Sequence, residues 1–313
     1  MKSFSAGLGG RALQALIVAL VVGVASFAMM HALPGDAAFR IAAGRYGYDV
    51  ADAAAAAAVR AELGLDRPMM VQLAAWLGEL LTFDLGRSSV TGMPIATELG
   101  HLSSNSFVLA LAAVLLSLVI AVPIGLLAAV SPGGLLDRGL LWVSIALRAT
   151  PAFVLGIALM LGLAVQLRLT PVAGHGTAAN MFLPTLTLGI GLAAVSSRVV
   201  RDAVVDVMRS DQFRFARAKG LSLRSAVGRH VVRNAAIPVV SYVGVQLAYL
   251  IEGVVIVEVL FAYPGVGHAL VHAIFGRDVP MVQGTALALG LFYVALSTII
   301  DLMCRGLDPR GRP

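Results

Sequence analysis

Basic side chains are concentrated in one stretch of this 313-residue chain. Only 13% of the residues are charged, whereas a soluble domain carries about a quarter. Nine lysines and arginines nevertheless lie between Arg198 and Arg233, with three carboxylates among them. We call this stretch the basic segment (198–233). A net charge of +6 can indicate nucleic-acid binding, but placement of the charge between apolar runs favours a membrane orientation signal.

The chain lacks the signatures of common hydrolases. It has no G-x-x-x-x-G-K-[ST] phosphate loop, so we do not expect it to hydrolyse ATP. It has no H-E-x-x-H or G-x-S-x-G pattern either, which leaves a membrane-embedded enzyme without visible catalytic groups. We therefore predict that the protein is not an enzyme.

The histidines and the cysteine indicate no metal centre. His268 and His272 are four residues apart, a spacing that places two imidazoles on one helix face. No carboxylate or thiol obviously joins them, so we predict a surface pair without a metal. Cys304 is the single cysteine and can form no internal disulfide.

Charged residues also occur within apolar stretches, where they are costly and often functional. Arg148 lies about eleven residues into one such stretch, close to Pro151, and Glu252 and Glu258 lie six residues apart in another. We predict that Arg148, Pro151, Glu252 and Glu258 line a substrate path. The alternative is a structural ion pair between helices.

The apolar stretches predict six membrane-spanning helices. Five charge-free runs are near or above the roughly 20 residues that a helix needs to cross a bilayer; they are 12–35, 102–136, 169–197, 234–251 and 279–300. A sixth, 139–167, is interrupted only by Arg148. We therefore expect an all-α membrane protein with six transmembrane helices. We expect the first span to remain in the mature chain, because no clear signal-peptide cleavage site follows it.

The distribution of basic residues predicts the orientation. Short loops rich in Lys and Arg stay in the cytoplasm, which places the basic segment and both termini there. The stretch between the first two spans holds eight carboxylates and five arginines, so we expect it outside. The predicted organisation is a cytoplasmic N-terminus with the first helix (1–30), an extracytoplasmic helical segment (31–101), a five-helix core (102–303) and a cytoplasmic tail (304–313). Within the core, a cytoplasmic loop covers about 204–237.

Local patterns predict further elements. Six alanines at 53–58 favour a helix over about 51–63, which we expect to be a solvent-facing spacer. The stripe Met69, Leu73, Trp76, Leu77 and Leu80 indicates an amphipathic helix on the outer membrane surface or against the spans. Four of the spans contain or begin with a proline that is expected to kink them, namely Pro123, Pro151, Pro184 and Pro238.

Within the basic segment, Gly220 should interrupt one helix and Ser222 should cap the next. Arg224, Arg229 and Arg233 then lie on one helical face. Two interpretations remain open: the helix binds a partner, or it lies on anionic lipid.

The chain contains FRFARAKGLS at 213–222 and RHVVRNAAIP at 229–238. These two stretches resemble the cytoplasmic signature loop of ABC-importer permeases, and in particular of their dipeptide, oligopeptide and nickel branch. Ala216 and Gly220 match the second alanine and the glycine of the family pattern E-A-A-x-x-x-G. Arg214 and Phe215 replace its glutamate and first alanine, a departure that the peptide branch shares.

Other landmarks of that branch follow in the same order along nearly the whole chain. They are HALPGDAA (31–38), LGLDRPMMVQ (63–72), FDLGRSSVTGMPI (83–95), TPAFVLGIAL (150–159) and VEVLFAYPGVG (257–267).

The resemblance implies a coupling helix around 216–225 that docks on a cytoplasmic ATPase. The implied coupling residues are Phe213, Phe215, Ala216, Arg217, Ala218, Lys219, Gly220, Leu221, Ser222 and Arg224. Phe213, Phe215 and Leu221 would supply apolar contact area, while Arg217, Lys219 and Arg224 would meet acidic groups.

The resemblance also implies the remaining parts of an importer. Tyr263, Pro264, Gly265 and Gly267 would help close an outer gate. The expected partners are a second homologous permease, two ABC ATPase subunits, an extracytoplasmic substrate-binding protein and the lipid bilayer, with no nucleic acid. This chain would hold no cofactor, because ATP and Mg²⁺ would bind to the ATPases. We expect an inner-membrane permease for di- or oligopeptides that works by alternating access. The rival is an ion-coupled secondary transporter or channel acting without an ATPase.

Overall fold

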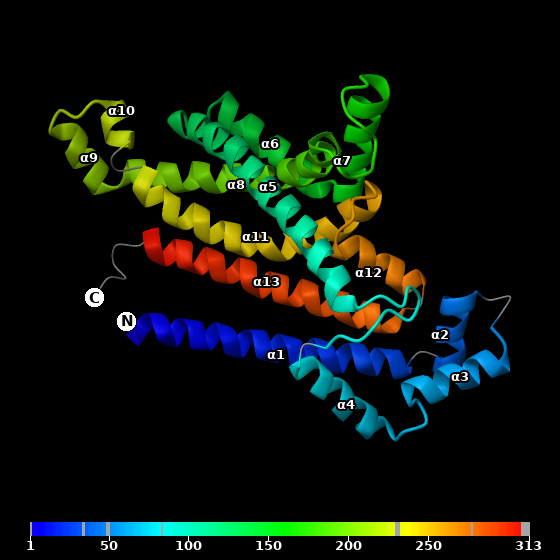
Figure 1. The fold of residues 1–313 in the computed structure, drawn as a ribbon. Coiled ribbons are helices and arrows are strands. Elements are labelled where there is room, and N and C mark those ends of the chain that lie inside the picture. Colours follow the sequence, from blue (N-terminus) through cyan, green and yellow to red (C-terminus); the bar gives the residue numbers. More distant parts are fainter. Residues whose placement is uncertain are drawn as a thin grey trace. The chain divides into compact units, whose positions relative to one another are not determined.

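A computed structural model describes residues 2–32, 35–47, 51–82, 84–228, 232–276 and 278–307 of the chain (Figure 1). The regular structure in these ranges is helical, which confirms the predicted all-α class. Arg229 and the end of the predicted tail, 308–313, lie outside the described residues. The chain forms two compact units, one of residues 1–107 and 264–294 and one of 108–263 and 295–313.

The described helices support three to five membrane spans by length and composition. Three are continuous: Ile95–Val130, Ala178–Arg209 and Val279–Cys304. Two more are bent pairs, Leu135–Ala149 with Ala152–Gln166 at 103° and Asn234–Leu247 with Tyr249–Leu260 at 53°. The first predicted span lies within a helix whose apolar stretch is the shorter Gly9–Ala25. The count of six therefore stays a prediction.

The first unit holds the N-terminal helices. It contains α1 (Lys2–Ala32), α2 (Ala37–Tyr46), α3 (Ala53–Leu63), α4 (Met69–Leu81) and α12 (Val266–Phe275), with the beginnings of α5 (Ile95–Val130) and α13 (Val279–Leu307). Carboxylates start two of these helices: Asp36 accepts the Ala38 N–H at 2.9 Å and Asp52 accepts the Ala55 N–H at 2.7 Å. Such N-caps satisfy donors that the first helical turn leaves without partners.

The alanine run of α3 faces solvent on one side, as we expected, because Ala53, Ala54, Ala57 and Ala58 are exposed, but its other side is packed. Its Ala56 and Val59 are buried against Ala38, Ile41 and Ala42 of α2. Small side chains let the two helices approach closely, so the run forms half of a packed helical pair. The next helix, α4, packs against α1. Its buried Trp76 donates the indole N–H to the Gly23 carbonyl of α1 at 3.3 Å.

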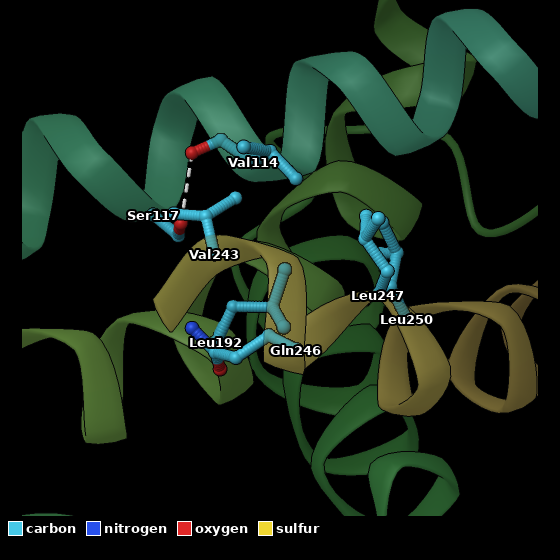
Figure 2. A pocket seen from close by; sticks show the side chains of 7 residues that line it. All are labelled: Val114, Ser117, Leu192, Val243, Gln246, Leu247 and Leu250. Carbon is cyan, nitrogen blue, oxygen red and sulfur yellow. Dashed lines mark hydrogen bonds between the residues drawn. The ribbon is translucent and has the colours of Figure 1, made fainter. Parts of the chain in front are cut away.

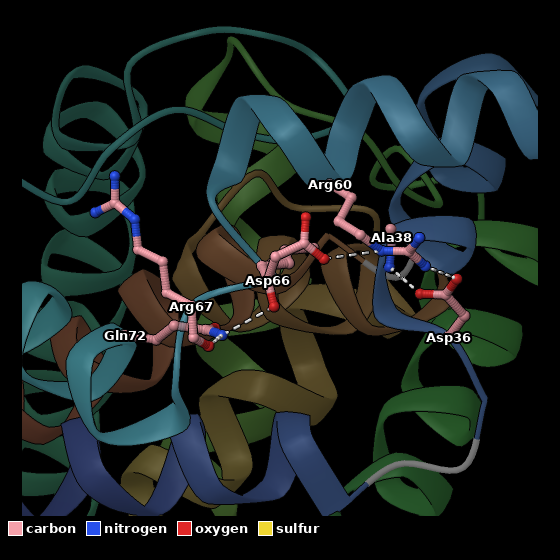
Figure 3. Close-up of polar contacts among 7 residues, drawn as sticks. Asp36, Ala38, Arg60, Asp66, Arg67 and Gln72 are labelled. Carbon is pink, nitrogen blue, oxygen red and sulfur yellow. Dashed lines mark hydrogen bonds and ion pairs between the residues drawn. The ribbon is translucent and has the colours of Figure 1, made fainter.

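Polar contacts hold the connection between these helices (Figure 3). Arg60 pairs with Asp36 and, at 3.7 Å, with Asp66. Gln72 donates to the carbonyls of Leu65 and Arg67 at 3.1 and 2.8 Å. The loop between α3 and α4 is thereby fixed from both sides.

The second unit is built around one long helix. It contains the rest of α5 and of α13, together with α6 (Leu135–Ala149), α7 (Ala152–Leu159), a π-helical turn (Met160–Gln166), α8 (Ala178–Arg209), α9 (Asp211–Ala218), α10 (Leu223–Ala226) and α11 (Val232–Leu260). The central α8 packs against α6, α7 and α11.

The four span prolines behave differently from one another. Pro151 separates α6 from α7, because proline disfavours a helical residue before it, and Thr150 is extended at ψ 120°. Pro123 and Pro184 lie inside α5 and α8, which continue through them. The bend of α11 lies between Leu247 and Tyr249, remote from Pro238.

Candidate functional site: the basic segment and the helix breaks

Residues 211–226 of the basic segment, which follow the end of α8, form two short helices joined by a turn. The first, α9, begins after Ser210, whose hydroxyl accepts the Phe213 N–H at 3.3 Å. It ends before Gly220, which has a φ of +87° that side-chain-bearing residues rarely adopt. Ser222 then accepts the Ser225 N–H at 3.3 Å and starts α10, as predicted. The stretch expected as one coupling helix, 216–225, is therefore a helix–turn–helix.

The inner face of this pair belongs to the protein's own core. Phe213, Ala216 and Ala226 are buried in a cluster with side chains of α8 and α11, among them Val204 and Val239. Leu221 is half-buried against the same cluster. The expectation that Phe213 presents its ring to a partner is corrected here, because the ring is 5% exposed. Phe213 instead fixes α9 to the ends of the long helices.

The outer face carries the exposed part of the predicted coupling set. Phe215 is 62% exposed, and the Lys219 ammonium lies 4.5 Å from the centre of its ring. Arg217 donates to the Leu221 carbonyl at 2.6 Å and so closes the turn. Ala218, Gly220 and Ser222 are exposed beside it, and Arg224 lies in α10. The face offers one large apolar side chain rimmed by cations.

An ion pair that the sequence did not reveal anchors α8 near this region. Arg201 donates to both carboxylate oxygens of Asp137, with Nε to Oδ1 at 2.8 Å and Nη2 to Oδ2 at 2.5 Å. Asp137 also accepts the Gly133 N–H at 2.7 Å, and Arg201 pairs with Asp202. The pair ties the start of α6 to α8. No local pattern connects residues 64 positions apart, so this contact required the tertiary structure.

Arg148 lies in the last turn of α6, at the break made by Pro151. Its guanidinium lies 4.2 Å from the centre of the Tyr249 ring, at the bend of α11. The breaks of the two bent pairs are therefore in contact through a cation–π interaction. Within the described residues, Arg148 forms no ion pair with Glu252. Glu252 is exposed, whereas Glu258 is fully buried.

A small cavity lies between α5, α8 and α11 (Figure 2). It measures about 10 Å³, enough for roughly one water molecule. Its lining is Val114, Ser117, Leu192, Val243, Gln246, Leu247 and Leu250. The buried Gln246 amide donates to the Ser196 hydroxyl at 2.6 Å. Sequence reasoning missed this polar pair, because an isolated Gln and Ser within apolar runs give no periodic signal.

The predicted outer-gate residues occupy the turn after α11 and the start of α12. Tyr263, Gly265 and Gly267 are buried and Pro264 is half-buried. Asn105 donates to the Pro264 carbonyl at 2.7 Å, and the Ser106 hydroxyl accepts the Val266 N–H at 2.9 Å. These two residues of α5 hold the turn and were not singled out in the sequence.

The histidine pair is a ring contact on α12. His268 and His272 have ring centres 4.4 Å apart. Among the described residues, no group of three or more His, Cys, Asp or Glu side chains could hold a metal ion.

The helical fold and the apolar spans define a multi-pass membrane protein, and sequence comparison gives its family. Residues 121–313 match the family described as "Binding-protein-dependent transport system inner membrane component", and residues 7–124 match the N-terminal region of the membrane component of such systems. The chain belongs to this family. It is thus an inner-membrane permease of an ABC importer, a system that also comprises ATPase and substrate-binding components.

Curated relatives share nearly the full length of the chain. A glutathione transport system permease protein, GsiC, of Pectobacterium atrosepticum is 37% identical over 94% of both chains. A putative peptide transport system permease protein of Brucella abortus is 35% identical, covering 96% of this chain and 97% of the relative. A solved amino acid ABC transporter covers 69% of this chain at 15% identity, with a TM-score of 0.46. The ion-coupled alternative finds no support among them.

Proposed function

We propose that this chain is one of two homologous permease subunits in an ATP-driven importer of di- and oligopeptides. Two ATPase subunits would hold ATP and Mg²⁺, and an extracytoplasmic binding protein would deliver the substrate. The peptide assignment is supported by relatives that carry peptide or glutathione names. Alternating access follows from differential affinity: ATP binding would favour an outward-open packing, and hydrolysis would return the bundle to the inward-open packing.

The observation that carries the proposal is the division of the α9–α10 pair into two faces. Phe213 and Ala216 fix its inner face to α8 and α11, whereas Phe215 and Lys219 stay on the outer face. A force applied to the outer face would therefore reach two long helices. We propose that the outer face docks on an ATPase, with Phe215 as the apolar anchor and Arg217, Lys219 and Arg224 facing acidic groups. Both termini would then be cytoplasmic.

We also propose that Arg148, Pro151 and Glu252 line the translocation path. Glu258, which we predicted to join them, is fully buried and is left out of this path. The support is the contact between the two helix breaks, since a cation at such a point can meet the carboxylate of a passing peptide. Replacing Arg148 with Met should abolish most uptake of a labelled dipeptide in vesicles. The control, Arg138→Met, removes a cation from the other end of α6 and should leave uptake intact. Normal uptake by the Arg148 variant at normal protein level would remove this residue from the path.

Purification and reconstitution test the function as a whole. The tagged chain, extracted from its own membrane in mild detergent, should elute together with an ATPase and a second permease. In proteoliposomes the complex should take up a labelled dipeptide or labelled glutathione only with ATP and the loaded binding protein. Flux catalysed by this chain alone, driven by an ion gradient, would contradict the proposal. So would a label on Ser222 that reacts only from the outside.

A further inference from the structure

Asp278 is a buried carboxylate that serves two elements at once. It is 4% exposed and lies just before α13. One oxygen, Oδ1, accepts the Met281 N–H at 3.3 Å, which caps α13, and the Ser89 N–H at 3.1 Å. The other, Oδ2, accepts the Ser88 hydroxyl and the Val90 N–H, the latter at 3.4 Å. The two oxygens of a carboxylate have lone pairs enough to accept all four of these bonds.

The loop on the other side of these bonds is buried where it meets Asp278, whereas Val90 is 39% exposed. Ser88 and Ser89 are 2% and 3% exposed. Ser88 donates its N–H to the Met93 carbonyl at 2.9 Å, and its hydroxyl accepts the Thr91 N–H at 2.8 Å. Buried backbone donors without partners are costly. The conformation of this loop therefore depends on the acceptors that Asp278 supplies. We call Ser88, Ser89, Val90 and Asp278 the clasp.

The clasp is continuous with α2 and α3. Arg45 of α2 donates its Nε–H to the Ser89 carbonyl at 3.0 Å and its Nη1–H to Glu62 of α3 at 2.8 Å. The backbones also touch: a Cβ placed on Gly44 would lie 2.6 Å from the Gly276 carbonyl oxygen, at the end of α12. An unbroken chain of polar contacts thus runs from α3 through α2 and the loop to the start of α13.

We propose that Asp278 is a positioning residue for transport, and that the clasp passes a load on α2 and α3 to α12 and α13. Chains of hydrogen bonds and packed side chains can carry coupling between distant elements. This inference rests on the proposed function in one respect, because the load would come from the docked binding protein. The clasp itself is independent of it. The helix that receives the load, α12, directly follows the turn of the predicted outer gate.

Hydrogen exchange of the purified full-length importer tests the clasp. In Asp278→Asn, one acceptor oxygen becomes an amide donor, so the amides of Ser89 and Val90 should exchange about ten- to a hundredfold faster. The matched control is Asp52→Asn, which alters another carboxylate N-cap of the same unit and should leave both amides unchanged. Equal exchange in Asp278→Asn and the wild type would overturn the inference.

The ATPase activity of the reconstituted importer tests the coupling. Asp278→Asn and Asp278→Ala should keep basal ATP hydrolysis and lose most stimulation by the loaded binding protein. A disulfide between positions 90 and 276 should restore the stimulation, because a Cβ on Gly276 would lie 3.9 Å from Val90 Cγ2. The variant for this test carries Asp278→Ala, Val90→Cys, Gly276→Cys and Cys304→Ser. The same variant kept reduced is the control.

The outcomes separate the two proposals. Stimulation at the wild-type level in Asp278→Ala would overturn the role of the clasp and leave the importer function standing. Basal and stimulated activity that fall together with the melting temperature would also overturn it, since Asp278 would then be structural only. A wild-type importer that no loaded binding protein stimulates would instead contradict the proposed function.

Discussion

The α9–α10 pair and the α2–α3 pair are both short helical pairs, but they use charge in opposite ways. In α2–α3, charged side chains pair with one another: Arg45 with Glu62, and Arg60 with Asp36 (Figure 3). In α9–α10, buried apolar side chains hold the pair in place. The exposed cations contact neutral groups of the pair itself. Arg217 bonds a backbone carbonyl and Lys219 lies over an aromatic ring.

The difference indicates where partners bind through charge. Ion pairs on a surface contribute only about 0–1 kcal/mol to stability. The pairs of α2–α3 therefore orient the two helices more than they stabilise them. Cations that have no carboxylate nearby remain available to an acidic surface, and they raise the rate of association more than the final affinity. We therefore expect substitutions in the two pairs to differ in size and in kind.

The largest effect should follow from removing the buried ring of Phe213 on the inner face of α9. Phe213→Ala should cost about 3–5 kcal/mol of local stability, because it leaves a cavity in the cluster of α8 and α11. We expect faster amide exchange throughout α9 and α10, and low uptake. Exchange that stays at the wild-type level would show that the inner face is not packed as described.

A smaller and different effect is expected from the outer face. Phe215→Ala should leave the melting temperature unchanged, because the ring is 62% exposed. The affinity of the Phe215→Ala permease for the ATPase should fall about thirtyfold if Phe215 is an interface anchor. Copurification yield at increasing dilution measures this loss. Val71→Ala, an exposed apolar residue of α4, is the control and should bind the ATPase normally.

The smallest effect should come from acid acting on α2–α3. The Arg45 hydrogen bond holds the pKa of the Glu62 carboxyl below its usual value. The pair therefore stabilises the fold above the ordinary Glu pKa of about 4.3, and this contribution is lost as the pH falls through the lowered value. Thermal unfolding at neutral and at acid pH should show a difference between the wild type and Glu62→Gln only at neutral pH. A constant difference would contradict the assigned pairing.

Local patterns were sufficient wherever one element alone decides the outcome. Gly220 ends a helix because of its backbone freedom, and Ser222 caps the next because its hydroxyl reaches a nearby N–H. The apolar runs predicted the long helices for the same reason, since hydrophobicity over about 20 residues needs no knowledge of neighbours.

Sequence by itself thus determined the helical class, the membrane-protein character and the position of the turn at Gly220. Only the tertiary structure decided which ring of Phe213 and Phe215 is buried, because both lie on the same short helix and differ only in what packs against them. It also joined Asp278 to Ser88 and Arg201 to Asp137, pairs that are 190 and 64 residues apart. Such contacts depend on how the long helices pack, and no local pattern of residues encodes that.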